Sequence, residues 1–108
     1  MTVRDLIAPL QLETLCEGNL DRTVETGYCG DLLSWVMGRA PADSAWFTVM
    51  GNVNAIAVCV LADIACVILC ENAALDEAAR TRAETEGIAV LRSPRDAYTL
   101  SIALAALL

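Results

Sequence analysis

The chain has 108 residues, long enough for one domain with its own core, and 56% of its residues are hydrophobic. Its 14 acidic and seven basic residues give a net charge of −7, so nucleic acid and anionic membrane surfaces are poor candidate partners. Histidine and lysine are both absent, which excludes histidine-activated nucleophiles, histidine metal sites, lysine Schiff bases and the lysine of a P-loop.

The cysteines and the longest apolar stretch bear on where the protein works. Five cysteines form no Cys-x-x-Cys pair, and this odd number without a signal peptide predicts reduced thiols in a cytoplasmic protein. Residues 53–70 are apolar over nearly the length of a membrane-spanning helix, but Asn54 and Asp63 interrupt them. We therefore expect a helix joined to a buried strand there, and no membrane segment.

The first predicted element is a short helix over residues 3–9, because Thr2 and Asp5 have the spacing of a capping box. Residues 11–16 are predicted to form a first strand, which polar and glycine residues end. A loop over residues 18–31 follows and is rich in acids, hydroxyls and glycines.

The middle of the chain predicts a second helix, a strand and a third helix. The second helix covers residues 31–37, with Gly30 and Gly38 at the positions that helix ends favour. Residues 45–50 are aromatic and β-branched, which favours a strand, and a helix over residues 54–63 follows a turn-like segment.

The last part of the chain predicts two buried strands, each followed by a helix. Residues 65–70 form a continuous apolar run, which is typical of a strand covered on both faces. Residues 76–87 read as a solvated helix, and residues 88–93 as another buried strand. We expect Ser93 to cap a final helix that runs almost to Leu108.

Strands that alternate with helices of this length predict right-handed crossovers and a parallel sheet covered on both sides. The fold class is therefore α/β, a three-layer α/β/α arrangement with a mainly parallel central sheet. No linker, internal repeat or low-complexity segment divides the chain, so we predict a single domain over residues 1–108.

In open α/β sheets, ligands bind outside the carboxyl ends of the strands, where loops lead into helices. The predicted strand ends are residues 18–31, 50–54, 71–72 and 92–94, and each carries polar or glycine residues after an apolar strand. Helix N-termini at these points can present free backbone N–H groups to an anion. We therefore expect one pocket at this end of the sheet.

The loop over residues 18–31 offers the densest set of polar groups. Its arginine, Arg22, can bind a phosphate or carboxylate through two parallel hydrogen bonds, and its glycines let the backbone approach a ligand. The alternative is structural: Asp21 and Arg22 pair with each other or with backbone, and Gly30 with Asp31 merely starts a helix. The candidate ligand-binding residues are Asp21, Arg22, Thr23, Gly27, Tyr28, Gly30, Asp31, Ser34, Asn52 and Asn54.

The order of these residues resembles a known family. The runs that carry the likeness are Asp21-Arg22-Thr23, Gly27-Tyr28, Gly30-Asp31-Leu32-Leu33-Ser34 and Val36-Met37. They resemble the signature of the DRTGG domain, and the likeness continues through residues 54–58, 65–70 and 86–88. One departure is that Val24-Glu25-Thr26-Gly27 stands where the signature has an immediate pair of glycines.

The resemblance implies an α/β domain similar to the N-terminal domain of HPr kinase/phosphorylase and of MurF-type ligases, without the catalytic part of either. Relatives of this kind occur fused to CBS domains and to phosphotransacetylase, which implies a regulatory role. It implies no cofactor, no metal and no catalytic residues. The absence of a P-loop and of lysine is in keeping with a domain that lacks kinase activity.

Three functions follow from these observations. The first is a non-catalytic regulatory module that binds a small anionic metabolite or a nucleotide at the loop, with help from Asn52 and Asn54. The second is an assembly module that acts as a homodimer without a small ligand and uses the apolar residues 97–108. The third is an enzyme, for which Cys29 in the polar loop is the best-placed nucleophile.

Overall fold

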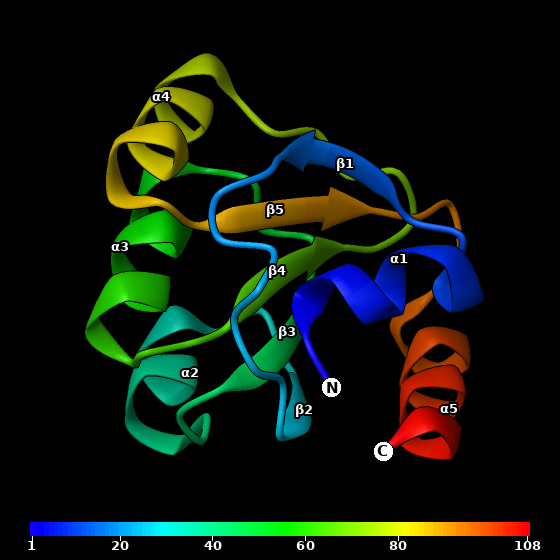
Figure 1. The fold of residues 1–108 in the computed structure, drawn as a ribbon. Coiled ribbons are helices and arrows are strands. Elements are labelled where there is room, and N and C mark those ends of the chain that lie inside the picture. Colours follow the sequence, from blue (N-terminus) through cyan, green and yellow to red (C-terminus); the bar gives the residue numbers. More distant parts are fainter.

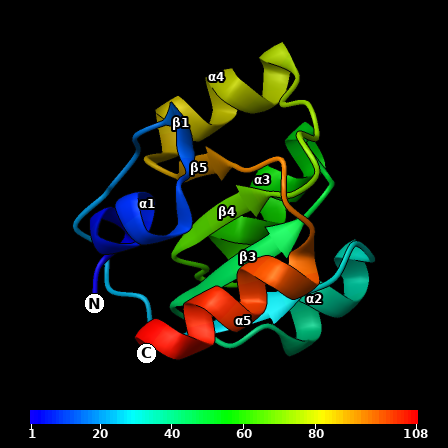
Figure 2. The same ribbon diagram turned by 90° about the vertical axis from the view of Figure 1, so that its right-hand side faces the viewer.

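The computed structural model describes residues 1–108 as a five-stranded sheet between two layers of helices (Figure 1). The strands are β1 (Glu13–Cys16), β2 (Thr26–Cys29), β3 (Ser44–Thr48), β4 (Cys66–Leu69) and β5 (Ala89–Arg92). The helices are α1 (Val3–Leu10), α2 (Leu33–Arg39), α3 (Val53–Leu61), α4 (Glu77–Glu86) and α5 (Ala97–Leu107). Figures 1 and 2 show α1 and α5 on one face of the sheet and α2, α3 and α4 on the other.

The sheet has the strand order β1-β5-β4-β3-β2. Strands β2, β3, β4 and β5 are parallel, whereas β1 lies antiparallel at the edge beside β5. Each parallel pair is joined by a crossover connection that contains a helix, because a tight turn cannot join two parallel neighbours. The predicted three-layer α/β fold with a mainly parallel sheet is therefore confirmed.

Two separate hydrophobic cores hold the helices to the sheet. In β3, Ala45 and Phe47 belong to the core under α1 and α5, whereas Trp46 between them belongs to the core under α2, α3 and α4. Successive side chains of a strand point to opposite faces, so a strand with both faces covered must be apolar throughout. All residues from Ile64 to Cys70 are accordingly buried.

Side chains at the helix starts satisfy backbone N–H groups that lack partners within the helix. Asn52, Asp76 and Asp96 accept hydrogen bonds from the third residue of α3, α4 and α5, at 2.9, 2.8 and 2.7 Å. Thr2 and Asp5 form the predicted capping box of α1. These bonds fix where each helix begins after the strand or loop before it.

Three local predictions need correction. Strand β2 lies inside the segment predicted as a loop; its four residues contain a glycine, and it is set by pairing with β3 rather than by its own pattern. Gly38 lies within α2 instead of ending it. The cap of α5 is Asp96, because Ser93 is buried and its hydroxyl accepts from the N–H of Arg95.

No helix of the protein combines the length and the apolar character that crossing a bilayer requires.

Candidate functional site

The direction of β1 decides where the Asp-Arg-Thr run lies. Because β1 is antiparallel to β5, the chain that leaves it emerges at the amino ends of the parallel strands. Arg22 contacts Asp43 and Asp63, which come just before β3 and β4. Asn52 follows β3 at the opposite end. The prediction of one pocket shared by the Asp-Arg-Thr run, Asn52 and Asn54 is therefore wrong.

Arg22 joins the loops that lead into β3 and β4. Its Nη2 atom lies 2.6 Å from Asp63 Oδ1, 2.7 Å from the Asp63 carbonyl and 3.2 Å from Asp43 Oδ1. Burial alone would lower the pKa of Arg22, but the two aspartates raise it above its usual value. Asp43 and Asp63 both have left-handed backbone conformations, with φ of 62° and 57°. Arg22 therefore holds two unusual turns in place.

The other two residues of the run support α1. Asp21 accepts from Arg4 at 3.2 Å, and Thr23 forms an isolated bridge with Thr2. The carbonyl of Arg22 accepts from the N–H of Val3 at 2.9 Å, which satisfies one of the free donors at the start of the helix. The run therefore has structural contacts, but Asp21 and Arg22 pair with other side chains and with the Asp63 carbonyl, and not with each other as the structural alternative also allowed.

The carboxyl end of the sheet holds a cavity of about 260 Å³, which we call the sheet-end cavity. Strand ends β2, β3 and β4 and the first turn of α5 surround it, and Gly30 and Asp31 among the predicted residues line it. Its lining residues are Cys29, Gly30, Asp31, Phe47, Thr48, Val49, Cys70, Glu71 and Ala97.

Asp31 is positioned by strand β3. Its Oδ1 atom accepts from the Thr48 hydroxyl at 2.7 Å and from the N–H of Val49 at 2.9 Å. These bonds leave Oδ2 without a partner in the protein, and the exposed Glu71 carboxylate has none either. The unused polar side-chain groups of the sheet-end cavity are therefore hydrogen-bond acceptors with negative charge.

Backbone contacts fix Glu71 at the rim of the cavity. Glu71 and Asn72 have φ of 55° and 56°, a tight reversal of the chain directly after β4. The N–H of Glu71 donates to the Arg95 carbonyl at 2.9 Å, and that of Asn72 donates to the Ser93 carbonyl at 3.0 Å. The loop after β4 is thereby tied to the segment that leads into α5.

The remaining predicted residues are spread over the molecule. Gly27 lies under α5, where a side chain would meet Leu104, and Tyr28 packs against the opposite core. The other three do not line a cavity: Ser34 is exposed on α2, Asn52 caps α3, and Asn54 is exposed in the first turn of that helix.

Most of the lining of the sheet-end cavity was not among the predicted residues. Thr48 and Val49 belong to the end of the predicted strand 45–50, and Glu71 to the predicted strand end 71–72. The rule that ligands bind where parallel strands end was therefore the signal that could have found them. The loop after β1 falls outside this rule, because β1 runs antiparallel to the other strands.

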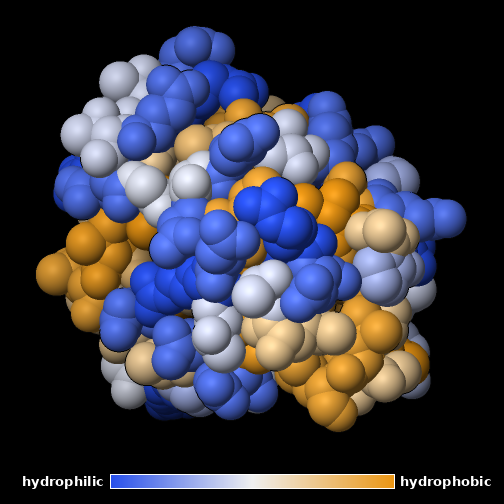
Figure 3. Space-filling model, viewed as in Figure 1, coloured by the Kyte–Doolittle hydropathy of each residue, from blue (hydrophilic) through white to orange (hydrophobic).

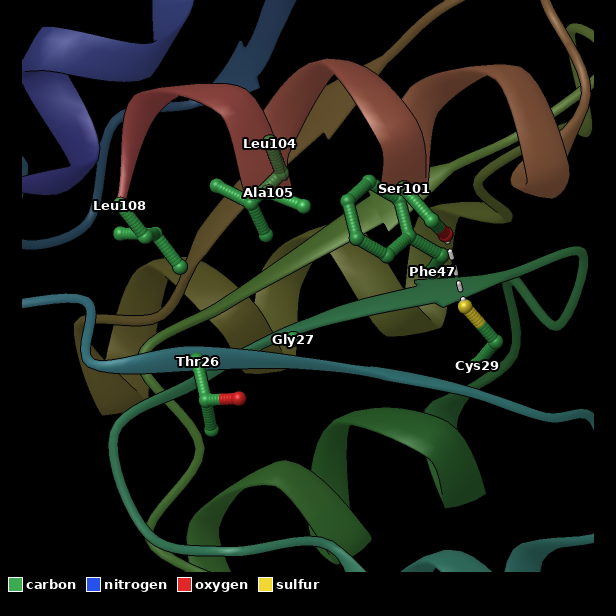
Figure 4. Close-up of a pocket in the computed structure, with 8 residues that line it drawn as sticks. All are labelled: Thr26, Gly27, Cys29, Phe47, Ser101, Leu104, Ala105 and Leu108. Atoms are coloured by element: carbon green, nitrogen blue, oxygen red, sulfur yellow. Dashed lines mark hydrogen bonds between the residues drawn. The ribbon is translucent and has the colours of Figure 1, made fainter.

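A second cavity, of about 230 Å³, lies between β2 and α5, and we call it the helix cavity (Figure 4). Five of its eight lining residues are hydrophobic, and Leu104, Ala105 and Leu108 come from α5 and the residue after it. The exposed Cys29 thiol lies 2.9 Å from the Ser101 hydroxyl, whereas the other four thiols are buried.

All seven arginines of the chain already contact protein groups. Four of them pair with carboxylates: Arg4, Arg22, Arg82 and Arg92. Arg80 and Arg95 donate to the carbonyls of Leu15 and Leu10, and Arg39 lies 3.7 Å over the Trp35 ring. No group of three or more potential metal ligands comes together in the structure. A ligand at the sheet-end cavity would thus meet carboxylates and backbone rather than an unused cation.

Comparisons with known proteins agree with this architecture. No curated protein matches the chain. The CBS and DRTGG domains of the regulatory region of Clostridium perfringens pyrophosphatase, solved with the activator diadenosine tetraphosphate, have a similar fold with a TM-score of 0.72. At 10% identity this likeness concerns the fold, and it covers 95% of this chain and 45% of that chain.

A family model described as the DRTGG domain matches residues 36–107. That range leaves out the Asp-Arg-Thr run and contains β3, β4, β5 and three complete helices, α3, α4 and α5. It covers well over half of the chain. The chain therefore belongs to the DRTGG domain family.

Proposed function

We propose that the protein is a non-catalytic regulatory module that senses a small metabolite, a nucleotide, through the sheet-end cavity. The observation that carries this proposal is the convergence of Asp31 and Glu71 on one cavity at the carboxyl ends of parallel strands. The Asp-Arg-Thr run, at the other end of the sheet, has no part in it.

The chemistry of the cavity favours the nucleoside part of such a ligand. Ribose hydroxyls and the amino group of a base are hydrogen-bond donors, and free carboxylate oxygens accept from them. A phosphate would meet two negative side chains and no unused arginine, so we place it outside the cavity, toward solvent. The volume of about 260 Å³ is slightly below the usual range of ligand pockets and suits part of a nucleotide.

The structural neighbour supports the class of ligand. Its regulatory region is described in complex with diadenosine tetraphosphate, which contains two nucleosides joined by phosphates. That ligand belongs to a longer protein with CBS domains, of which this chain matches 45%. The class of ligand in our proposal therefore comes from this neighbour, and the binding site comes from the sheet-end cavity.

A non-catalytic role is supported by the side chains available. The chain offers no histidine or lysine as a general base. Burial raises the pKa of Cys66 and of Cys70 to about 12, which keeps both thiols protonated and unreactive at neutral pH.

Thermal-shift and calorimetric titrations test the proposal. Adenosine, AMP, ATP and diadenosine tetraphosphate should each raise the melting temperature, whereas inorganic pyrophosphate should not. A ligand at 100 times its Kd stabilises the folded state by about 2.7 kcal/mol. Asp31→Asn keeps an oxygen for Thr48 and Val49 and replaces the free acceptor by a donor, so we expect it to weaken nucleoside binding by at least about tenfold.

Glu84→Gln on α4 is the matched control, because Glu84 is exposed and lines neither cavity. It should bind as the unmodified chain does. Equal binding by Asp31→Asn and the unmodified chain would contradict the proposed site. A response to pyrophosphate alone would contradict recognition of the nucleoside.

The alternative function, an assembly module without a small ligand, is favoured by a different observation. Helix α5 carries no charged residue, yet Tyr98 and Ile102 on it are exposed. Failure of all nucleosides to bind, together with self-association, would favour this function.

A further inference from the structure

We infer that the edge of the sheet formed by β2, with α2 and α5 on either side of it, is the surface through which two copies of this chain pair. The three segments that form this surface, which we call the β2 face, are residues 26–29, 32–38 and 97–108. Figure 1 shows α2 and α5 flanking β2 at one end of the sheet. This inference is independent of the proposed ligand site.

The β2 face combines a lack of charged residues with several exposed apolar side chains. In a chain in which 19% of residues are charged, none of its three segments contains a charged residue. Large apolar side chains are exposed on it instead: Leu32, Trp35, Met37, Tyr98, Ile102 and Leu108. Figure 3 shows hydrophobic residues gathered where Figure 1 places α5. A helix that is apolar all round is normally buried, whereas α5 buries only Leu100 and Leu104 within one copy.

The two edges of the sheet differ in how they are protected. Edge β1 has an irregular register between Thr14 and Cys16, and Arg80 binds the Leu15 carbonyl on that strand. Bulges, charges and covering side chains are the devices that keep an edge strand from pairing with another chain. Strand β2 has no charge, no proline and no bulge in its register with β3. Its outward backbone groups are therefore open to a further strand.

The geometry favours a second copy as the occupant. An edge strand paired antiparallel with its own copy about a twofold axis is self-complementary, as a closed dimer requires. Helix α5 contacts both β2 and β3, so its axis lies over the space between them. With strands about 4.8 Å apart, the two α5 helices would then lie about 10 Å from each other, at the upper end of the 8–10 Å range for packed helices.

The occupant is also constrained by charge. Two copies that each carry a net charge of −7 repel, and the three segments of the β2 face add no acidic side chain to the contact, which Glu25 and Asp31 border at the two ends of β2. The helix cavity, with its mostly apolar lining, opens beside this face and receives partner side chains in the pair.

Sedimentation and light scattering over a range of concentrations test the inference. The unmodified chain should reach twice its mass of 11.5 kDa. Ile102→Glu places a charge at a side chain that is 54% exposed, so the fold should persist while the dimer dissociation constant rises by at least about tenfold. Leu61→Glu on α3, at a side chain that is 72% exposed, is the matched control and should remain dimeric.

Cross-linking locates the contact. Antiparallel pairing centred on β2 brings the two Cys29 Cα atoms within about 15 Å, and Cys29 carries the one exposed thiol. A short bismaleimide should therefore join two copies, and Cys29→Ser should abolish the product. A monomer at all concentrations would overturn the inference, and so would a dimer that survives Ile102→Glu and does not cross-link, because another surface would then hold it.

Discussion

At the scale of single residues, Arg22 illustrates how one side chain can connect distant parts of the sequence. It contacts residues 21 and 41 positions away along the chain, Asp43 and Asp63, and its own carbonyl holds the start of α1. Both aspartates have a left-handed backbone conformation. Such a conformation costs free energy and persists only where the surrounding structure holds the turn. Arg22 therefore contributes to stability through two loops and a helix at once.

Arg22→Ala should lower the free energy of unfolding by about 2 kcal/mol, because charge-assisted hydrogen bonds to two loops are lost. Urea unfolding followed by circular dichroism measures this change. Arg4→Ala is the matched control: its ion pair with Asp21 is largely exposed, so the change should be within about 0.5 kcal/mol. Equal losses in the two variants would contradict the structural role of Arg22.

The residue scale also shows the limit of reading a site from a motif. A cluster of arginine, acidic and glycine residues looks the same in the sequence whether its side chains bind a ligand or bind other groups of the protein. The partners of Arg22 come from positions 43 and 63, and only the fold brings these positions beside it. By contrast, Gly30 and Asp31 from the same predicted loop do line the sheet-end cavity, because they follow β2, a strand that was not predicted.

At the scale of elements, strands covered on both faces and capped helices could be predicted from the sequence. The helices α3, α4 and α5 and the strands β3, β4 and β5 lie within one to three residues of their predicted positions. Strand β2 was missed because four residues with a glycine carry almost no pattern of their own. The reversed direction of β1 could not be predicted either, since it depends on which neighbour the strand pairs with.

The surroundings of Gly51 and Gly38 predict opposite effects of a glycine-to-alanine substitution on stability. A methyl group on Gly51 would lie 1.8 Å from the Ala74 carbonyl oxygen, so Gly51→Ala should destabilise the protein by about 1–3 kcal/mol. Gly38 lies within α2 with open space around it, so Gly38→Ala should stabilise by about 0.5–1 kcal/mol. Differential scanning calorimetry should show melting temperatures that move in opposite directions; a shift of both the same way would contradict these packing arguments.

At the scale of the whole molecule, two cores of 15 and 14 residues on opposite faces of one sheet account for its stability. Four of the five cysteines lie in them. Burial raises the pKa of Cys59, and it raises that of Cys66 to about 12 from an ordinary value of 9.0. The folded state therefore disfavours thiolates that the unfolded chain forms readily at alkaline pH.

Stability should be independent of these thiols below about pH 9 and should fall as the pH rises from 9 toward 12, since only the unfolded state releases their protons there. Unfolding free energies at pH 7, 9 and 10.5 measure the slope. Cys66→Ala should make the slope shallower, whereas Cys29→Ser, at the exposed thiol, should leave it unchanged. An unchanged slope in Cys66→Ala would contradict this assignment.

The reversal of the chain at Glu71 and Asn72 has a consequence for the molecule as a regulator. Glu71 lines the sheet-end cavity, and the N–H groups of Glu71 and Asn72 bind the carbonyls of Arg95 and Ser93 in the segment that leads into α5. A ligand that binds Glu71 would thus contact a loop tied to the segment before α5, the helix that the inferred pairing places against a second copy. Ligand binding and pairing would then be thermodynamically linked through these two hydrogen bonds, each altering the other's equilibrium by the same factor.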